Sequence, residues 1–114
     1  MNNKQIGDDE KFKESKGKRK WELLPFDALE EVVKAFEFGV NKYGEPYTYR
    51  PGITYSKIAG AAFRHLIDWY WKREELATDS GIHHLAHLAA NALMLLSMIM
   101  YNCDKRFDNR PDRR

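Results

Sequence analysis

The hydrophobic pattern of the chain centres on Ser80 to Cys103, SGIHHLAHLAANALMLLSMIMYNC, a stretch that contains no Asp, Glu, Lys or Arg. Charged residues make up 32% of the whole sequence, so a helix formed by this stretch needs cover on nearly every side. Its length alone would allow a membrane span. However, three histidines and Asn91 crowd its first half, and no aromatic belt flanks it. We therefore predict a buried central helix and no membrane partner.

A polar seam runs along this predicted helix. His84, His87 and Asn91 stand at positions i, i+3 and i+7, which places all three on one face. A buried polar side chain without a hydrogen-bond partner costs about 1–3 kcal/mol, so the neighbouring helices must bring polar groups to the same place. The three residues of this seam are consistent either with core side chains that are hydrogen-bonded to their neighbours or with a functional site.

Two further helices are predicted before this one. Between residues 21 and 44 the apolar residues recur at a spacing of 3.6. Pro25 and Asp27 suit a helix start, and Gly44 suits a left-handed C-terminal cap, which together predict a helix over residues 26–43. Residues 45–54 contain two prolines and a glycine and are predicted to form a structured loop.

The second helix is predicted to start at Ser56 as its N-cap and to continue to about Glu75. Residues 77–81 would then connect it to the central helix, with Asp79 or Ser80 as the N-cap of that helix. The small residues at 59–62, AGAA, are typical of a close approach between helices.

This pattern predicts an all-α fold with three main helices. Two helices cannot easily cover a third helix that is apolar all round, so we expect a dimer or tetramer in which neighbouring chains complete a four-helix-type bundle and share the site. The expected organisation is a disordered basic arm at residues 1–19, a folded domain at residues 20–103 and a frayed basic tail at residues 104–114.

Composition narrows the function classes. The chain has 114 residues, enough for one domain, and a formal net charge of +2, with basic ends on either side of an acidic body. That distribution does not make a specific nucleic-acid face, whereas an acidic body suits a metal site. The single Cys103 and the lack of an apolar leader-like segment in the first 20 residues favour a cytoplasmic protein.

Carboxylates gather at two places. On the first helix, Asp27, Glu30 and Glu31 are three or four residues apart, so at least two share a face. Glu74 and Asp79 come just before the histidines. Oxygen ligands with one or two imidazoles suit Mg²⁺, Mn²⁺ or a borderline transition metal. These residues also fit purely structural roles. Asp27, Glu30 and Glu31 fit a solvent-exposed helix start, Glu74 fits an exposed helix end, and Asp79 fits a helix cap.

Cationic and aromatic groups of the kind a nucleotide needs occur on the first two helices. Lys42 and Tyr43 end the first helix, and Arg64 and His65 lie on the second. Arg64 is equally suited to an ion pair with Asp68, four residues on. The tyrosines of YTY and the tryptophans of WYW are more typical of core and interface residues than of base-stacking platforms.

At this point the sequence resembles a known family. The segments WELLPFDALEEVVKAFEFGVNKYG and RHLIDWYWKREELATDSGIHHLAHLAANALMLL look like the phage-type dATP/dGTP diphosphohydrolase domain, which is similar in turn to the MazG-like all-α nucleoside triphosphate pyrophosphohydrolases. The resemblance covers about residues 18–97. It implies hydrolysis of dGTP and dATP to the monophosphate and pyrophosphate, with Mg²⁺ or Mn²⁺ to neutralise the triphosphate and activate the attacking water. Such an activity would shape the nucleotide pool during phage replication, in the host cytoplasm.

The resemblance also assigns roles by position. Glu30 and Glu31 match the acidic pair of the first helix and would be catalytic. The metal ligands would be Glu30, Glu31, Glu74, Asp79, His84 and His87. The residues that contact the substrate would be Lys42, Tyr43, Arg64, His65 and Asn91.

The sequence departs from the MazG-like pattern at two positions. Lys34 stands at the third carboxylate of the first helix, and His84-x-x-His87 stands where E-x-x-D would fall. These departures leave a nonenzymatic nucleotide-binding module or sponge as an alternative. A metal phosphohydrolase of the HD type is a further alternative, although the adjacent His-Asp pair of that class does not occur.

Overall fold

The computed structural model describes residues 17–101 and 104–112. They form three α-helices and two short 3-10 helices, together with one isolated bridge between Leu76 and His83, which confirms the all-α class. In chain order the elements are η2 (Trp21–Leu23), α2 (Phe26–Tyr43), α3 (Tyr55–Tyr70), α4 (His84–Tyr101) and η3 (Lys105–Phe107). Most of the expected arm at residues 1–19 lies outside the described residues.

The predicted first helix is confirmed as α2, from Phe26 to Tyr43. Pro25 precedes it, and Asp27 lies in its first turn. Gly44 has a φ of 89°, and its N–H donates to the carbonyl of Val40 over 2.7 Å, which is the left-handed cap that the sequence predicts.

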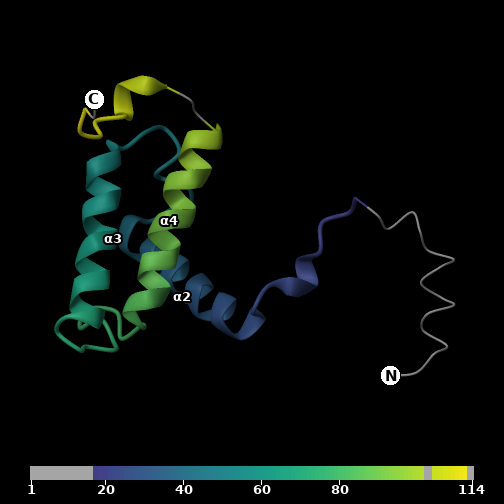
Figure 1. Ribbon diagram of the computed structural model, residues 1–114, viewed down its shortest axis with the longest axis vertical. Coiled ribbons are helices and arrows are strands. Elements are labelled where there is room, and N and C mark those ends of the chain that lie inside the picture. Colours follow the sequence, from purple (N-terminus) through teal and green to yellow (C-terminus); the bar gives the residue numbers. More distant parts are fainter. Residues whose placement is uncertain (1–16, 102–103, 113–114) are drawn as a thin grey trace, which may run out of the picture.

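Helix α4 packs against both other helices. Figure 1 shows α3 and α4 side by side and antiparallel, with α2 crossing them and leading out toward the N-terminus. Small residues form the α2 contact: Val32 and Ala35 meet Ala86 and Ala90. A second buried cluster joins Tyr49 and Ile58 to Met98 near the other end of α4. The core therefore follows α4 as two small clusters.

Helix α3 ends at Tyr70, five residues before the predicted end near Glu75. The N–H groups of Trp71 and Lys72 both donate to the carbonyl of Ile67, and Arg73 then adopts a left-handed φ of 61°. The chain reverses there, and the N–H of Glu74 donates to the carbonyl of Asp68 over 3.0 Å. The prediction of a longer helix was wrong because helical periodicity does not show where a non-glycine residue takes a left-handed turn.

Two predicted helix caps also differ from the structure. Thr54, not Ser56, is the N-cap of α3. At α4, His83 takes the place of Asp79 or Ser80: its Nδ1 accepts from the N–H of Leu85 over 3.0 Å, and its carbonyl accepts from Ala86. The helix starts at His84 for this reason.

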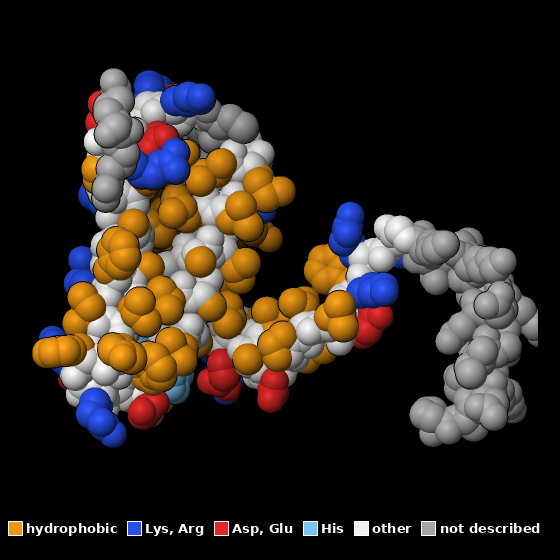
Figure 2. Space-filling model, viewed as in Figure 1, with side chains coloured by type: hydrophobic (Ala, Val, Ile, Leu, Met, Phe, Trp, Pro, Cys, Tyr) orange, Lys and Arg blue, Asp and Glu red, His pale blue; other side chains and the backbone are white. Residues whose placement is uncertain are grey.

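Helix α4 is not covered on every side within one chain. By length and composition it is apolar enough to cross a membrane. His84 and Asn91 are buried inside the protein, whereas Leu93, Leu96 and Met100 are exposed. Figure 2 shows hydrophobic side chains gathered over the visible face of the α3 and α4 pair. A single chain therefore does not cover this helix on every side, as the sequence predicts for a bundle of only three helices.

The segment after α4 folds back onto the start of α3, although the sequence predicted a frayed tail. Asn109 Oδ1 accepts from the N–H of Ser56 over 2.9 Å, and Asn109 Nδ2 donates to Ser56 Oγ over 2.7 Å. The ring of Phe107 lies against Gly52. Residues 104–112 therefore form a strap across the loop that precedes α3.

We predict that Gly52→Ala destabilises the protein by about 1–3 kcal/mol, because Gly52 has a φ of 132°, a region nearly restricted to glycine. An added Cβ would also collide with the Phe107 ring. Thermal and urea unfolding measure the change. Gly39→Ala is the matched control: apart from its chain neighbours and its own helix backbone, no atom of the described residues lies within 4 Å of its Cβ position, and alanine in a helix should stabilise by about 0.5–1 kcal/mol. Equal stability of the two variants would contradict the prediction.

Candidate functional site

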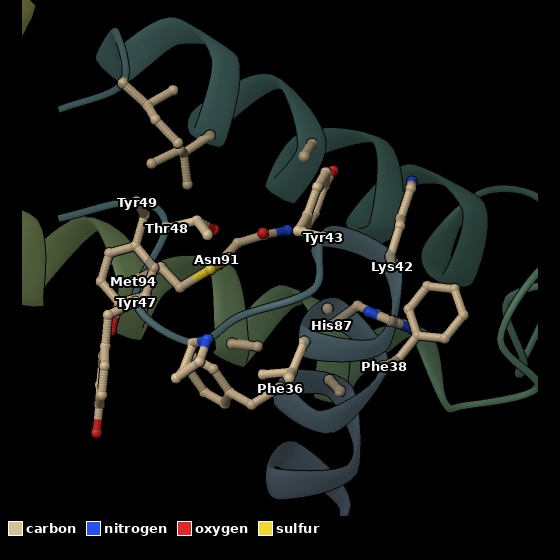
Figure 3. Close-up of a pocket in the computed structure, with 18 of the residues that line it drawn as sticks. Phe36, Phe38, Lys42, Tyr43, Tyr47, Thr48, Tyr49, His87, Asn91 and Met94 are labelled. Carbon is tan, nitrogen blue, oxygen red and sulfur yellow. The ribbon is translucent and has the colours of Figure 1, made fainter. Parts of the chain in front are cut away.

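A cavity of about 570 Å³ opens between α2, the loop at residues 45–54, α3 and α4. This volume is in the range of pockets that bind small molecules. Figure 3 shows Lys42, Phe38 and His87 at one end and Tyr47, Tyr49 and Met94 at the other, with Asn91 reaching in between them. The cavity therefore has a polar end and an aromatic end.

The aromatic end is held by the loop that joins α2 to α3. The guanidinium of Arg50 stacks 3.9 Å from the ring centroid of Tyr47 and 5.2 Å from that of Tyr101. The N–H of Ile53 donates to Met98 Sδ over 3.2 Å, and Tyr49 is buried beside it. These contacts fix the loop against the end of α4 and present aromatic faces to the cavity.

Six predicted site residues line the cavity: the polar groups of Lys42, Asp79, His87 and Asn91, together with Tyr43 and His65. Lys42 lies in the last turn of α2, with its ammonium 5.5 Å from the ring centroid of Tyr43, which also lines the cavity. An ammonium, a carboxylate, an imidazole and an amide provide both donors and acceptors. The polar end can bind a charged, polar ligand.

Three histidines form a cluster behind the polar end. The Nδ1 atoms of His65 and His84 lie 2.8 Å apart, a hydrogen-bond distance. The rings of His65 and His87 stack, with centroids 4.7 Å apart and planes inclined by 9°. Nε2 of His87 lies 2.7 Å from Ser80 Oγ, and Phe38 meets His87 edge-on. The predicted seam thus finds its polar partners on α3 and on the loop before α4.

Burial and mutual repulsion favour the neutral form of His65 and His87. Burial lowers the pKa of His65, and the neighbouring His87 and His84 lower it further. Burial also lowers the pKa of His87, and His84 contributes, although the carboxylate of Asp79 partly opposes the shift. At neutral pH the cavity therefore presents uncharged imidazoles.

A group of possible metal ligands lies beside the histidine cluster. Ligand atoms of Asp68, Glu74 and His84 all lie within 4.8 Å of one another. The Nε2 of His84 is 3.5 Å from Glu74 Oε1 and has no hydrogen-bond partner within residues 17–101 and 104–112, and the residue is only 3% exposed. Glu74 and His84 were predicted as ligands, and the structure brings them together.

Other predicted residues lie apart from this group. Glu31 forms an ion pair with Lys34, with Nζ and Oε2 2.8 Å apart. Glu30 is exposed on α2, and neither Glu30 nor Glu31 lines the cavity. Arg64 is exposed on α3 and is not part of the cavity wall. Asp68 pairs with Lys72 over 3.3 Å, in place of the Arg64 partner that the spacing suggested.

Sequence reasoning missed four contributors. Asp68 was considered only as an ion-pair partner of Arg64, since its place beside Glu74 depends on the early end of α3. Ser80 was predicted as a cap but contacts His87. Tyr47 and Tyr49 were predicted as core or interface residues, and both also line the cavity. The position of both tyrosines in a proline- and glycine-rich loop was the available signal for a binding loop.

Comparison with known proteins identifies the family. Residues 8–110 match the family described as dATP/dGTP diphosphohydrolase, N-terminal. The chain belongs to this family. No curated protein and no solved structure matched the chain. The dATP/dGTP diphosphohydrolase match includes every residue of the cavity wall and the strap as far as residue 110. Its name denotes a hydrolase that acts on purine deoxynucleotides.

We predict that this diphosphohydrolase-family domain loses stability as the pH falls from about 7 to about 5. The unfolded chain takes up protons on its histidines near pH 6.5, whereas His65 and His87 in the folded chain take them up at lower pH. The unfolded state therefore binds more protons in this interval, and the free energy of unfolding decreases. Urea unfolding of chelator-treated protein across the interval measures the slope.

The free energy of unfolding should change less steeply with pH in His87→Asn, because this variant lacks one of the two imidazoles whose pKa is lowered. Thr78→Ala, a change in an exposed loop residue, should keep the slope of the unchanged protein. A free energy of unfolding that stays constant from pH 7 to pH 5 would contradict the prediction.

Proposed function

We propose that the protein hydrolyses dATP and dGTP to the deoxynucleoside monophosphate and pyrophosphate. Membership of the dATP/dGTP diphosphohydrolase family carries this proposal. The reaction adds water to the α-phosphorus and breaks the anhydride bond between the α- and β-phosphates. Its effect in a cell would be to lower the supply of two purine deoxynucleotides, as a phage could use during replication in the host cytoplasm.

The aromatic end of the cavity suits the purine base. Tyr47, Tyr49 and Phe36 line it, and aromatic faces stack on the π-face of a base. The amide of Asn91 both donates and accepts, as the polar edge of a purine requires. The base would therefore lie between the loop and α4.

The triphosphate suits the polar end. Lys42 offers a positive charge, and the neutral imidazole of His87 can accept or donate a hydrogen bond. Mg²⁺ or Mn²⁺ would supply neutralisation of the triphosphate and activation of water. Asp79 and His87, both predicted as metal ligands, line the cavity and have suitable donor atoms for that ion.

The carboxylates of α2 are less well placed to bind the divalent ion that accompanies the triphosphate. Glu31, proposed as catalytic with Glu30, is held by Lys34 in the isolated chain. The ion pair occupies one of the oxygens that a divalent ion would need. This observation favours the second candidate, a module that binds nucleotides without hydrolysing them. Measurement of products separates the two functions.

The test is to incubate the pure protein with each deoxynucleoside and ribonucleoside triphosphate, plus Mg²⁺ or Mn²⁺, and to separate the products by ion exchange. We expect dAMP or dGMP together with pyrophosphate from the purine deoxynucleotides. Inorganic phosphate or triphosphate would instead favour the HD-type chemistry. Tight binding of dATP or dGTP with no product would establish the binding module and overturn the proposed reaction.

Lys42→Gln should lower kcat/KM for dGTP by roughly 10- to 100-fold, because one charge-assisted contact to phosphate is lost. Lys20→Gln is the matched control, since Lys20 is exposed before η2 and outside the cavity. Steady-state kinetics of pyrophosphate release measure both variants. Equal losses in the two variants would show that Lys42 contributes only to the net charge.

We also propose that the protein is a homo-oligomer. Leu93, Leu96 and Met100 of α4 are 44%, 55% and 73% exposed, and their spacing places them on one stripe. Phe63 and Ile67 form a similar exposed stripe on α3. A second copy that packs its own α3 and α4 on these stripes would complete a four-helix arrangement.

Size-exclusion chromatography with light scattering should give two or four times the chain mass of 13.4 kDa. Leu96→Glu should shift the protein to the monomer mass, since it places a charge in the proposed interface without touching the core of the chain. Thr78→Glu, which adds the same charge to an exposed loop residue, should leave the assembly intact. A monomer for the unchanged chain would contradict the proposal.

A further inference from the structure

The early end of α3 builds a second polar site beside the nucleotide cavity. Asp68 comes from the last turns of α3, Glu74 from the loop after it, and His84 from the first position of α4. The backbone hydrogen bond from Glu74 to Asp68 holds the two carboxylates together, and a bond from the N–H of His84 to the carbonyl of Glu75 ties α4 to the same loop. None of these three residues lines the nucleotide cavity.

The imidazole of His84 is the decisive group. Its side chain is 4% exposed, and its Nε2 has no hydrogen-bond partner among the described residues. Glu74 Oε1, at 3.5 Å, is beyond a good N–H···O distance. A buried nitrogen without a partner costs about 1–3 kcal/mol. A ligand that accepts the lone pair of Nε2 would remove this cost.

The other nitrogen of His84 is already placed as metal sites require. Metal-binding histidines almost always donate the N–H of their second ring nitrogen to a fixed partner. Nδ1 of His84 lies 2.8 Å from Nδ1 of His65 and can donate to it. Nε2 is then left with its lone pair, directed at the two carboxylates.

We propose that Asp68, Glu74 and His84 bind a divalent transition-metal ion, distinct from the ion that accompanies the triphosphate. One imidazole and two carboxylates suit Mn²⁺, Co²⁺ or Zn²⁺ better than Mg²⁺, which prefers oxygen ligands. Ligand atoms each about 2.1 Å from an ion lie roughly 3 to 4 Å apart. The carboxylates, which are partly exposed, need to close by only about 1 Å from their present spacing.

Lys72 gives the site a distinctive test. Its ammonium lies 3.3 Å from Asp68 Oδ1, where it competes with a metal ion for that oxygen. Removal of this charge should therefore strengthen metal binding, whereas removal of either carboxylate should weaken it. A purely structural cluster would show no such opposite response.

The experiment is titration of the full chain with Co²⁺ after removal of metals by a chelator, with no nucleotide present. Isothermal titration calorimetry gives the affinity, and the visible absorption of Co²⁺ reports its ligands. We expect Asp68→Asn and Glu74→Gln to weaken Co²⁺ binding by at least about tenfold. Lys72→Gln should strengthen it. Glu37→Gln, an exposed acid on α2, is the control for loss of one negative charge.

Three results would overturn the proposal: no Co²⁺ binding by the unchanged chain, equal binding by the Asp68→Asn, Glu74→Gln and Glu37→Gln variants, or displacement of Co²⁺ by a small excess of Mg²⁺. Co²⁺ should also raise the melting temperature of the unchanged chain and not that of Asp68→Asn, a readout independent of calorimetry. Because no nucleotide is present, failure here leaves the proposed hydrolysis untouched, and failure of the hydrolysis leaves this site untouched.

Discussion

Two imidazole nitrogens 2.8 Å apart, one on His65 and one on His84, determine how α3 lies on α4. Apolar contacts such as that of Ile58 with Met98 hold α3 near α4 but do not select one rotation of a helix about its own axis. A buried hydrogen bond does, because a slip of one residue would leave both nitrogens without partners. The stack of His65 on His87 and the contact of His87 with Ser80 depend on that same rotation.

The histidine cluster also connects the two sites that the molecule presents. His87 faces the cavity, and His84 faces the carboxylates of Asp68 and Glu74. His65 touches both histidines and lines the cavity itself. The neutral rings of His65 and His87 suit this position, since two positive charges stacked so close together would repel one another. The apolar helix thus carries its polar groups where two separate ligands can use them.

The sequence predicted the class of fold and the bounds of α2, because 3.6-residue periodicity and a glycine cap are local signals. It also predicted the seam of His84, His87 and Asn91. The end of α3 and the strap after α4 were not predictable in the same way. They depend on a left-handed Arg73 and on contacts of Asn109 with Ser56, residues 53 positions apart. The position of Asp68 beside Glu74 and His84 follows from the left-handed Arg73.

The strap has a consequence for where the domain ends. Phe107 and Asn109 hold the start of α3 and the loop that carries Tyr47 and Tyr49. The family match runs to residue 110, just past these contacts. A boundary drawn at the end of the last long helix would cut away the segment that braces the binding loop. The contacts that brace the binding loop therefore extend through Asn109, beyond the last long helix.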